Sequence, residues 1–286
     1  MISFRKENIN YTSSGIPKII HQVWINDTFL GNPKKDVPQE WIKSIELWKE
    51  IHPDWTHILW TDDMALTYLN KFHPDVIDHY KNYEYLIQRA DMIRYFILYD
   101  YGGVYCDLDL YPSKNIDDYI IGPYDHFVYS AGSDVTTNAF MISPKGSNIM
   151  RELCLKLKED VPWFCVGKHL KVMYSTGPNF LYNVLLNTKN PYIILPKKLF
   201  YPYSSSEDKM INETTQDIVI SPIKNTSGSW HSIDSIIYTF INKNKEIFIT
   251  IGILTVLLVI IGLIYYIFKY RKCKESKDKC EQECKI

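Results

Sequence analysis

Two aspartates placed two residues apart, Asp107 and Asp109, are the strongest candidates for chemistry in this chain. On a β-strand, alternate side chains share a face, so these carboxylates would lie roughly 6.5 to 7 Å apart. Two unpaired carboxylates are costly in a cleft of low dielectric, and a divalent cation removes that cost. Their oxygens suit Mg²⁺ or Mn²⁺, which also bind water and substrate phosphates. The pair therefore predicts a metal-assisted reaction on a phosphate-bearing substrate such as a nucleoside diphosphate.

A helix is expected directly upstream of the aspartates. Apolar residues recur there at intervals of four, three and four, at Leu86, Ala90, Ile93 and Ile97. This spacing predicts a helix that is buried on one side. Asp91 and Arg94 fall three residues apart on another face of the same helix, where side chains at i and i+3 meet.

A glycine turn and a strand are expected to connect this helix to the aspartates. Gly102 and Gly103 follow the periodic residues, so the helix is predicted to end near residue 100 or 101. From residue 104 the pattern alternates, which places Tyr105 on the same strand face as Asp107 and Asp109. A proline at position 112 then ends the strand.

Simpler interpretations exist for each part. A bare Asp-x-Asp sequence also fits a solvated edge strand, and Asp91 with Arg94 also fits a surface ion pair worth about 0.3–0.5 kcal/mol. The helix, the glycine turn and the acidic strand in this order favour the metal site.

The blocks Arg-Ala-Asp-x-x-Arg-Tyr, Gly-Gly-x-Tyr and Asp-x-Asp follow one another between residues 88 and 112. This order resembles the signature of the DXD-containing sugar-transferase family that includes yeast-type mannosyltransferases and inositol phosphoceramide mannosyltransferases. It is similar, more distantly, to the clostridial glucosylating toxins. The likeness runs from Ile16-Pro-Lys-Ile-Ile-His-Gln-Val-Trp24 to Gly228-Ser-Trp-His231 and covers nearly all of residues 16–232.

The resemblance implies a metal-dependent glycosyltransferase that retains the anomeric configuration of the transferred hexose. The most specific expectation is mannose from GDP-mannose, delivered to a membrane acceptor such as an inositol phosphoceramide-type sphingolipid. Two alternatives stay open: a transferase acting on protein-linked or other glycans, and a catalytically silent, membrane-tethered module that binds a nucleotide sugar. A phosphatase of the haloacid-dehalogenase type also carries Asp-x-Asp after a strand, but Leu110-Tyr111 departs from its usual Gly or Thr.

The resemblance also implies roles for individual residues. Trp24 would stack on the donor nucleobase, although a core tryptophan is an equal alternative. Asp91 would hold sugar hydroxyls, Arg94 would lie beside the sugar and phosphate, and Tyr105 would donate a hydrogen bond to the phosphate. Asn138 would contact the sugar, or would be a turn asparagine.

A later segment, Ser227-Gly-Ser-Trp-His231, would close over the donor. Family members often carry a further histidine before it, where this chain has Lys224-Asn-Thr226. The expected catalytic set is Asp91, Arg94 and Asp109, and the expected metal ligands are Asp107, Asp109 and His231. The expected donor-binding set is Trp24, Asp91, Arg94, Tyr105, Asp107, Asn138, Ser229 and Trp230.

Short apolar runs predict strands at residues 18–24, 56–60, 103–110, 126–130 and 139–143. Helical patterns separate the strands, and two of the predicted helices span residues 40–50 and 148–159. This alternation predicts an α/β open sheet with its ligand site beyond the carboxyl ends of the strands. The resemblance narrows it to the nucleotide-sugar-binding fold called GT-A, with helices on both faces. We expect residues 1–242 to form one catalytic domain.

The chain has 32 Lys and Arg residues and 33 Asp and Glu residues, which gives a net charge of −1. This balance argues against nucleic acid as a partner.

Residues 247–268 contain no charged side chain and are long enough to cross a bilayer as a helix. They predict a C-terminal membrane anchor, followed by a short basic tail with cysteines at residues 269–286, and the expected location is a secretory-pathway membrane. The basic flank favours a cytosolic tail. The first residues lack the apolar region of a signal sequence, which favours a cytosolic catalytic domain instead. The side of the membrane therefore stays open.

Overall fold

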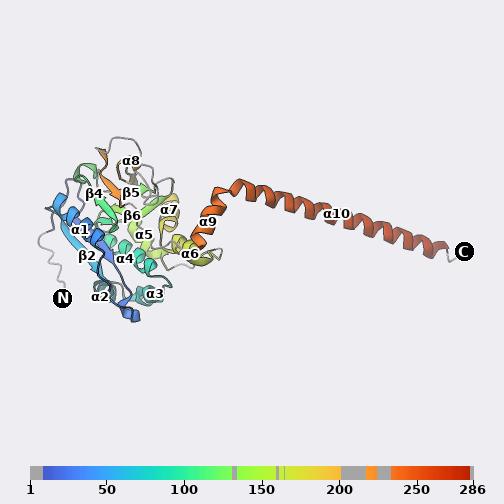
Figure 1. Ribbon diagram of the computed structural model, residues 1–286, viewed down its shortest axis with the longest axis horizontal. Helices are drawn as coiled ribbons and strands as arrows, with labels where there is room; N and C mark the ends of the chain where they lie inside the picture. The colour runs from blue at the N-terminus through green and yellow to red at the C-terminus, as the bar shows by residue number, and fades with distance from the viewer. Residues whose placement is uncertain are drawn as a thin grey trace. The chain divides into compact units, whose positions relative to one another are not determined.

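The computed structural model of this protein describes residues 9–130, 134–158, 161–163, 165–200, 217–223 and 233–283. The chain divides into two compact units, Met1–Ser232 and Ile233–Ile286, and each is described by itself. Figure 1 labels the elements of both units.

The first unit is built around a mixed six-stranded sheet with the strand order β2-β1-β3-β6-β5-β7. β1 pairs in parallel with β2 and β3, β6 is antiparallel to β3 and β5, and β7 is parallel to β5. The strands are β1 (Ile19–Trp24), β2 (Thr56–Thr61), β3 (Gly103–Cys106), β5 (Asp125–Tyr129), β6 (Thr136–Ser143) and β7 (Tyr192–Ile194). A separate pair is formed by β4 (Leu110–Pro112) and β8 (Ile220–Pro222).

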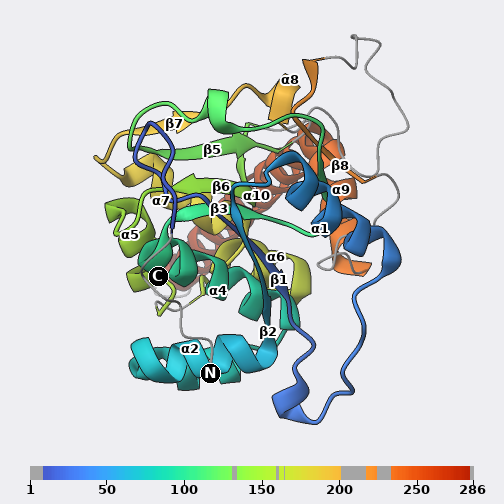
Figure 2. The ribbon, with the colours of Figure 1, turned by 90° about the vertical axis from the view of Figure 1, so that its left-hand side faces the viewer.

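Helices cover both faces of this sheet. They are α1 (Gln39–Ile51), α2 (Asp62–Phe72), α3 (Ile77–Asn82), α4 (Leu86–Tyr101), α5 (Asn148–Lys156), α6 (Gly167–Ser175), α7 (Pro178–Asn187) and α8 (Lys197–Phe200). Tyr105 of β3 packs into a core with α2, α4, α5 and α7, whereas its neighbours Val104 and Cys106 pack into a second core with α1 and α8. Figure 2 shows α2 and α4 on the opposite side of the sheet from α1 and α8. The predicted α/β sheet with helices on both faces is confirmed.

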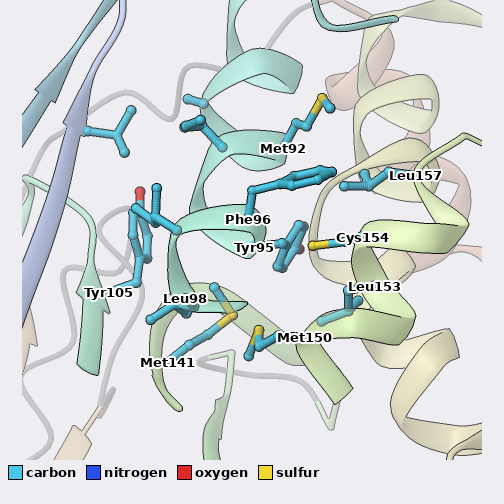
Figure 3. Packing of buried hydrophobic residues seen from close by; sticks show 14 of the residues in the cluster. Met92, Tyr95, Phe96, Leu98, Tyr105, Met141, Met150, Leu153, Cys154 and Leu157 are labelled. Carbon is cyan, nitrogen blue, oxygen red and sulfur yellow. The ribbon is translucent and has the colours of Figure 1, made fainter. Parts of the chain in front are cut away.

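The central helix α4 differs from its prediction in how it is buried. It ends at Tyr101, as the glycines indicated, but every residue from Gln88 to Leu98 is buried. The expectation of one buried side is wrong, because the polar residues of α4 also lie inside the protein. In Figure 3, Tyr95 points toward Cys154 of α5 and Phe96 points toward Leu157, whereas Tyr105 lies on another side of the helix.

The glycine turn brings β3 close against its neighbours. Gly102 and Gly103 have φ values of 67° and 98°, which favour glycine. A Cβ on Gly102 would lie 2.5 Å from the backbone nitrogen of Lys145. A Cβ on Gly103 would collide with the carbonyl oxygen of Ile19. Both positions therefore require glycine for space as well as for conformation.

The acidic residues lie in a turn, which corrects the prediction of one strand over residues 103–110. β3 ends at Cys106 and β4 begins at Leu110, so Asp107 and Asp109 lie between two strands. The N–H of Leu110 donates to the carbonyl of Asp107 over 3.2 Å and closes the turn. β3 is buried on both faces, so its alternating pattern reflects two cores and not one core facing solvent.

The other predicted strands correspond to β1, β2, β5 and β6 with shifts of a few residues at their ends. The predicted helix at 40–50 is α1, and the one predicted at 148–159 is α5, which ends at Lys156. Ser147 caps α5 by accepting hydrogen bonds from the N–H groups of Ile149 and Met150. The predicted site residues Ser229, Trp230 and His231 lie outside the described residues.

The second unit consists of α9 (Ile233–Lys243) and α10 (Lys245–Glu283). Within α10, residues Lys245–Arg271 are apolar and long enough to be a candidate membrane span, and none of this segment is buried. The predicted anchor at 247–268 lies inside it.

Candidate functional site

The sheet brings the predicted site residues to one edge. Trp24 is the last residue of β1, and Asp107 and Asp109 directly follow β3. Because β1 and β3 are parallel, their carboxyl ends lie at the same edge. Asn138 joins them from the antiparallel strand β6, where the carbonyl of Ala139 accepts a hydrogen bond from the Asp107 N–H over 2.8 Å.

The acidic turn is anchored by its central residue. Leu108 is buried, whereas Asp107 and Asp109 on either side of it are half-buried. The carbonyl of Asp109 accepts a hydrogen bond from the N–H of Ile223, which directly follows β8. The apolar anchor and this bond fix the turn between the sheet and the β4–β8 pair.

Two side chains hold Asp107 through the same oxygen. The hydroxyl of Tyr105 donates to Oδ1 of Asp107 over 2.6 Å, and Nη1 of Arg94 lies 3.3 Å from that atom. The Arg94 guanidinium also lies over the Tyr105 ring, 4.5 Å from its centroid. The shared face predicted for Tyr105 and Asp107 therefore places the two side chains in direct contact.

Asp91 lies behind this contact and is only 3% exposed. Its Oδ1 accepts from Nη2 of Arg94 over 2.9 Å and from Nδ2 of Asn138 over 3.0 Å. Its Oδ2 accepts from the hydroxyl of Thr176 over 2.9 Å. Burial raises the pKa of Asp91 to about 6, although Arg94 and the hydrogen bonds oppose the rise. Asp91 and Arg94 form a buried ion pair, so the surface-pair alternative is excluded.

Arg94 links three parts of the site. Besides its two carboxylate partners, it donates from Nη1 to the carbonyl of Asn138 over 2.8 Å. Burial alone would lower the pKa of Arg94, but the neighbouring Tyr105, Asp107 and Asp91 raise it, so the guanidinium keeps its charge. Asp91 and Asp107 are two carboxylates beside this one guanidinium, and Asp109 follows two residues later in the acidic turn. The excess of negative charge suits a bound cation.

The residues present fit a divalent cation bound together with a diphosphate. Both contacts of Asp107 use Oδ1, and Oδ2 of Asp107 makes no hydrogen bond within the described part of the chain. The described residues contain no group of three or more His, Cys, Asp or Glu placed to hold a metal. A Mg²⁺ or Mn²⁺ site needs only one or two carboxylates when substrate phosphates supply the other ligands. Asp107 and Asp109 meet that requirement.

Trp24 is half-buried at the end of β1, whereas Trp48 and Trp60 are fully buried in the core. Its indole Nε1 donates to the carbonyl of Lys35 over 2.9 Å, and its ring meets Trp41 edge to face at 5.2 Å. These contacts fix an aromatic side chain at the edge of the site.

A second buried cluster, not expected from the sequence, supports the loop after Trp24. The carboxylate of Asp62 accepts hydrogen bonds from the N–H groups of Asn26 and Asp27 at 2.8 and 2.9 Å. Asp27 has a φ of 56°, and its carboxylate pairs with Nη1 of Arg89 at 2.9 Å. Thr176 was missed as well, although it lies in the block Ser175-Thr-Gly-Pro178. No local pattern distinguishes these residues, because their partners are distant in the sequence.

Residues 38–127 match the protein family described as the glycosyltransferase sugar-binding region containing the DXD motif. Residues 38–127 of this chain therefore form a glycosyltransferase sugar-binding region with a DXD motif. The match includes α4, the glycine turn and the acidic turn, whose Asp107-Leu-Asp109 is the DXD motif. The resemblance predicted from the sequence is confirmed.

Two relatives of this chain are named for a ceramide lipid that carries inositol phosphate. The chain is 29% identical over 270 residues to inositol phosphoceramide mannosyltransferase 3 of Schizosaccharomyces pombe, covering 93% of this chain and 69% of that protein. It is 36% identical over 167 residues to a mannosyl phosphorylinositol ceramide synthase of Saccharomyces cerevisiae, covering 58% of this chain and 41% of that protein. This chain therefore spans less than half of the second relative.

Among solved structures, the PaToxG glycosyltransferase is similar with a TM-score of 0.43 and 17% identity, covering 59% of this chain and 68% of that one.

Proposed function

We propose that this chain transfers a mannosyl group from GDP-mannose to the inositol phosphate headgroup of a sphingolipid, with retention of configuration and dependence on Mn²⁺ or Mg²⁺. The observation that carries the proposal is the DXD turn, presented at the sheet edge and backed by the buried Arg94. The acceptor is suggested by the names of the relatives, which are inositol phosphoceramide mannosyltransferases.

In this proposal Asp107 and Asp109 hold the cation, which when bound neutralises charge on the departing diphosphate. Arg94 is fully engaged with Asp91, Asp107 and the Asn138 carbonyl, so it positions the DXD motif and lends positive charge to it. No carboxylate is assigned as a nucleophile. Displacement on one face of the sugar, guided by this charge, is the proposed course.

Asp91 remains the candidate partner of a donor sugar hydroxyl. Among the described residues, only Thr176 donates a hydrogen bond to its Oδ2, and a carboxylate oxygen accepts two. Asn138 holds Asp91 from the other side, so its role is to orient that carboxylate. The single hydroxyl proton of Tyr105 is given to Asp107, so Tyr105 positions the motif in this arrangement. Trp24 is the proposed platform for the nucleobase.

The full chain in lipid nanodiscs tests this function by release of nucleoside diphosphate from a panel of sugar donors. We expect turnover of GDP-mannose that needs Mn²⁺ or Mg²⁺ and is lost in Asp109→Asn. Asp63→Asn is the matched control, because Asp63 is exposed and lies outside the site. Turnover that survives both EDTA and Asp109→Asn would refute the metal role.

The acceptor is tested by adding phosphorylinositol ceramide to the nanodiscs and detecting mannosylated lipid by mass spectrometry. Product with this lipid, and none with a soluble glycan, is the expected result. Transfer only to glycans would favour the protein-glycan alternative. Donor binding without release or transfer would favour the silent binding module.

The candidate span in α10 supports a membrane location, and we propose a membrane of the secretory pathway. Protease protection of the first unit in sealed vesicles would determine which side of the membrane it occupies.

A further inference from the structure

The short helix α9 has one apolar face. Isoleucine or phenylalanine occupies positions 233, 236, 237, 240 and 241, the spacing of one side of a helix, and polar residues occupy positions 234, 235, 239 and 242. The apolar side chains are exposed, by 69% at Ile236, 54% at Ile237, 60% at Phe240 and 43% at Ile241. We call these four residues the apolar face of α9.

This face continues onto the candidate span. α9 ends at Lys243 and α10 begins at Lys245, with Asn244 between them. The Asn244 side chain donates to the Phe240 carbonyl over 2.8 Å, and the Ile247 N–H donates to the Asn244 carbonyl over 3.0 Å. The Phe240 and Phe248 rings meet edge to face at 6.2 Å. The two helices are therefore joined by a polar residue, and their apolar sides contact each other through Phe240 and Phe248.

The charged residues at the junction determine the depth in the bilayer at which α9 joins the candidate span. Lys243, Lys245 and Glu246 carry charges that need water or lipid headgroups, so this end of the span lies at headgroup level. α9 has 11 residues and is about 16 Å long, too short to cross a bilayer. A helix with one apolar and one polar side that begins at headgroup level is most stable lying in the interface.

We infer that α9 lies in the plane of the bilayer interface, with its apolar face against the lipid acyl chains. The inference rests on the proposed membrane function of α10. It adds a second lipid contact directly after the catalytic unit in the chain. That contact would hold the start of the anchor at the depth where a lipid acceptor presents its headgroup.

Photo-crosslinking on the full chain in phosphatidylcholine vesicles tests this inference. Benzoylphenylalanine replaces Ile237 or Phe240 on the apolar face, Asn242 at the opposite register position, or Leu258 within the candidate span. We expect lipid adducts from positions 237, 240 and 258, and at least severalfold fewer from 242. Equal labelling at 237 and 242, or protein adducts in place of lipid adducts at 237, would overturn the inference. Absence of lipid adducts at 258 would remove its premise and overturn it as well.

A matched pair of charge substitutions gives a functional readout. Phe240→Asp places a carboxylate on the apolar face, and Asn242→Asp places one on the polar side. We expect the first to lower transfer to a vesicle-borne acceptor severalfold relative to the second, with equal donor hydrolysis in the absence of acceptor. Equal transfer by both variants would count against the inference. Absence of donor hydrolysis by the wild-type protein would instead refute the proposed function. Failure of the inference about α9 and failure of the proposed function are therefore distinguishable.

Discussion

Nη1 of Arg94 lies 3.3 Å from Oδ1 of Asp107, and the two side chains differ sharply in exposure, at 3% and 32%. The cation of this pair is buried in α4, and its carboxylate reaches the surface at the DXD turn. A ligand can approach Asp107 without displacing Arg94. The buried guanidinium thus sets the electrostatic field of the motif from behind.

Replacing Arg94 by lysine, Arg94→Lys, should abolish most activity while keeping a positive charge. Lysine cannot serve Asp91, Asp107 and the Asn138 carbonyl at once, because it lacks the planar fork. We expect about a 100-fold loss of donor turnover and a loss of roughly 3 kcal/mol in unfolding free energy, as for other broken buried pairs. Donor turnover and urea unfolding measure these effects. Arg151→Lys, at an exposed position, should change neither.

Activity should rise with pH between about 5 and 7 as Asp91 ionises. Its pKa is raised to about 6, so the carboxyl is protonated below that pH and charged above it. The contribution of Asp91 to folding stability changes with pH in the opposite direction to the activity. The folded state binds this proton more tightly than the unfolded chain does, so the stabilising contribution is present below the ordinary aspartate pKa of 3.8 and is lost as pH rises through the folded pKa of about 6.

A pH profile of donor turnover provides the test, with Asp125→Asn as control. Burial also raises the pKa of Asp125 to about 6, but its partners are Ser143 and Ser147, away from the DXD motif. The Asp125 variant should therefore keep the rise in activity. A flat profile for the wild type would contradict the role given to Asp91.

Removing the Asp62 carboxylate, in Asp62→Ala, should weaken donor binding. The N–H groups of Asn26 and Asp27 would lose their acceptor, and the loop after Trp24 would lose its support. We expect KM for the donor to rise several-fold with a smaller change in kcat. Asp63→Ala removes the adjacent exposed carboxylate and should leave both constants unchanged. An equal effect of the two substitutions would argue against the proposed support.

Substituting alanine for Gly103 should unfold or strongly destabilise the first unit. The added Cβ would collide with the Ile19 carbonyl, and the φ of 98° is strained for alanine. Gly146→Ala is the control, because Gly146 also has a positive φ of 74° but nothing lies within 4 Å of its Cβ position. Strain alone should cost that variant about 1 kcal/mol. Thermal unfolding of both variants measures the difference.

Local patterns in the sequence predicted the elements whose signals are local. The end of α4 followed from Gly102 and Gly103, β1 followed from a run of apolar residues, and α1 followed from apolar residues spaced three or four apart. The all-round burial of α4 was not predictable in this way. It depends on the hydrogen bonds that Asp91 accepts from Asn138 and Thr176, which are distant from α4 in the sequence. These bonds, together with the pair between Asp91 and Arg94, allow polar side chains of α4 to be buried.

The same limit explains the strand break at the DXD motif. Alternation continues from Tyr105 through Leu110, so the pattern favours one strand. The break at Asp107 depends on two distant partners: β6 stays paired only as far as the Asp107 N–H, and β8 pairs with β4 beyond the turn. Both partners are remote in sequence, and neither leaves a signal near the motif.

The pairing of β8 with β4, together with the bond from Ile223 to the Asp109 carbonyl, determines where this protein can be truncated. A soluble version cut before β8 would remove the strand that borders the DXD turn along with the anchor. A version cut after Ile223 would keep that border. Deletion series intended to map the anchor would lose this border of the DXD turn once they pass position 223, for a reason unrelated to the membrane.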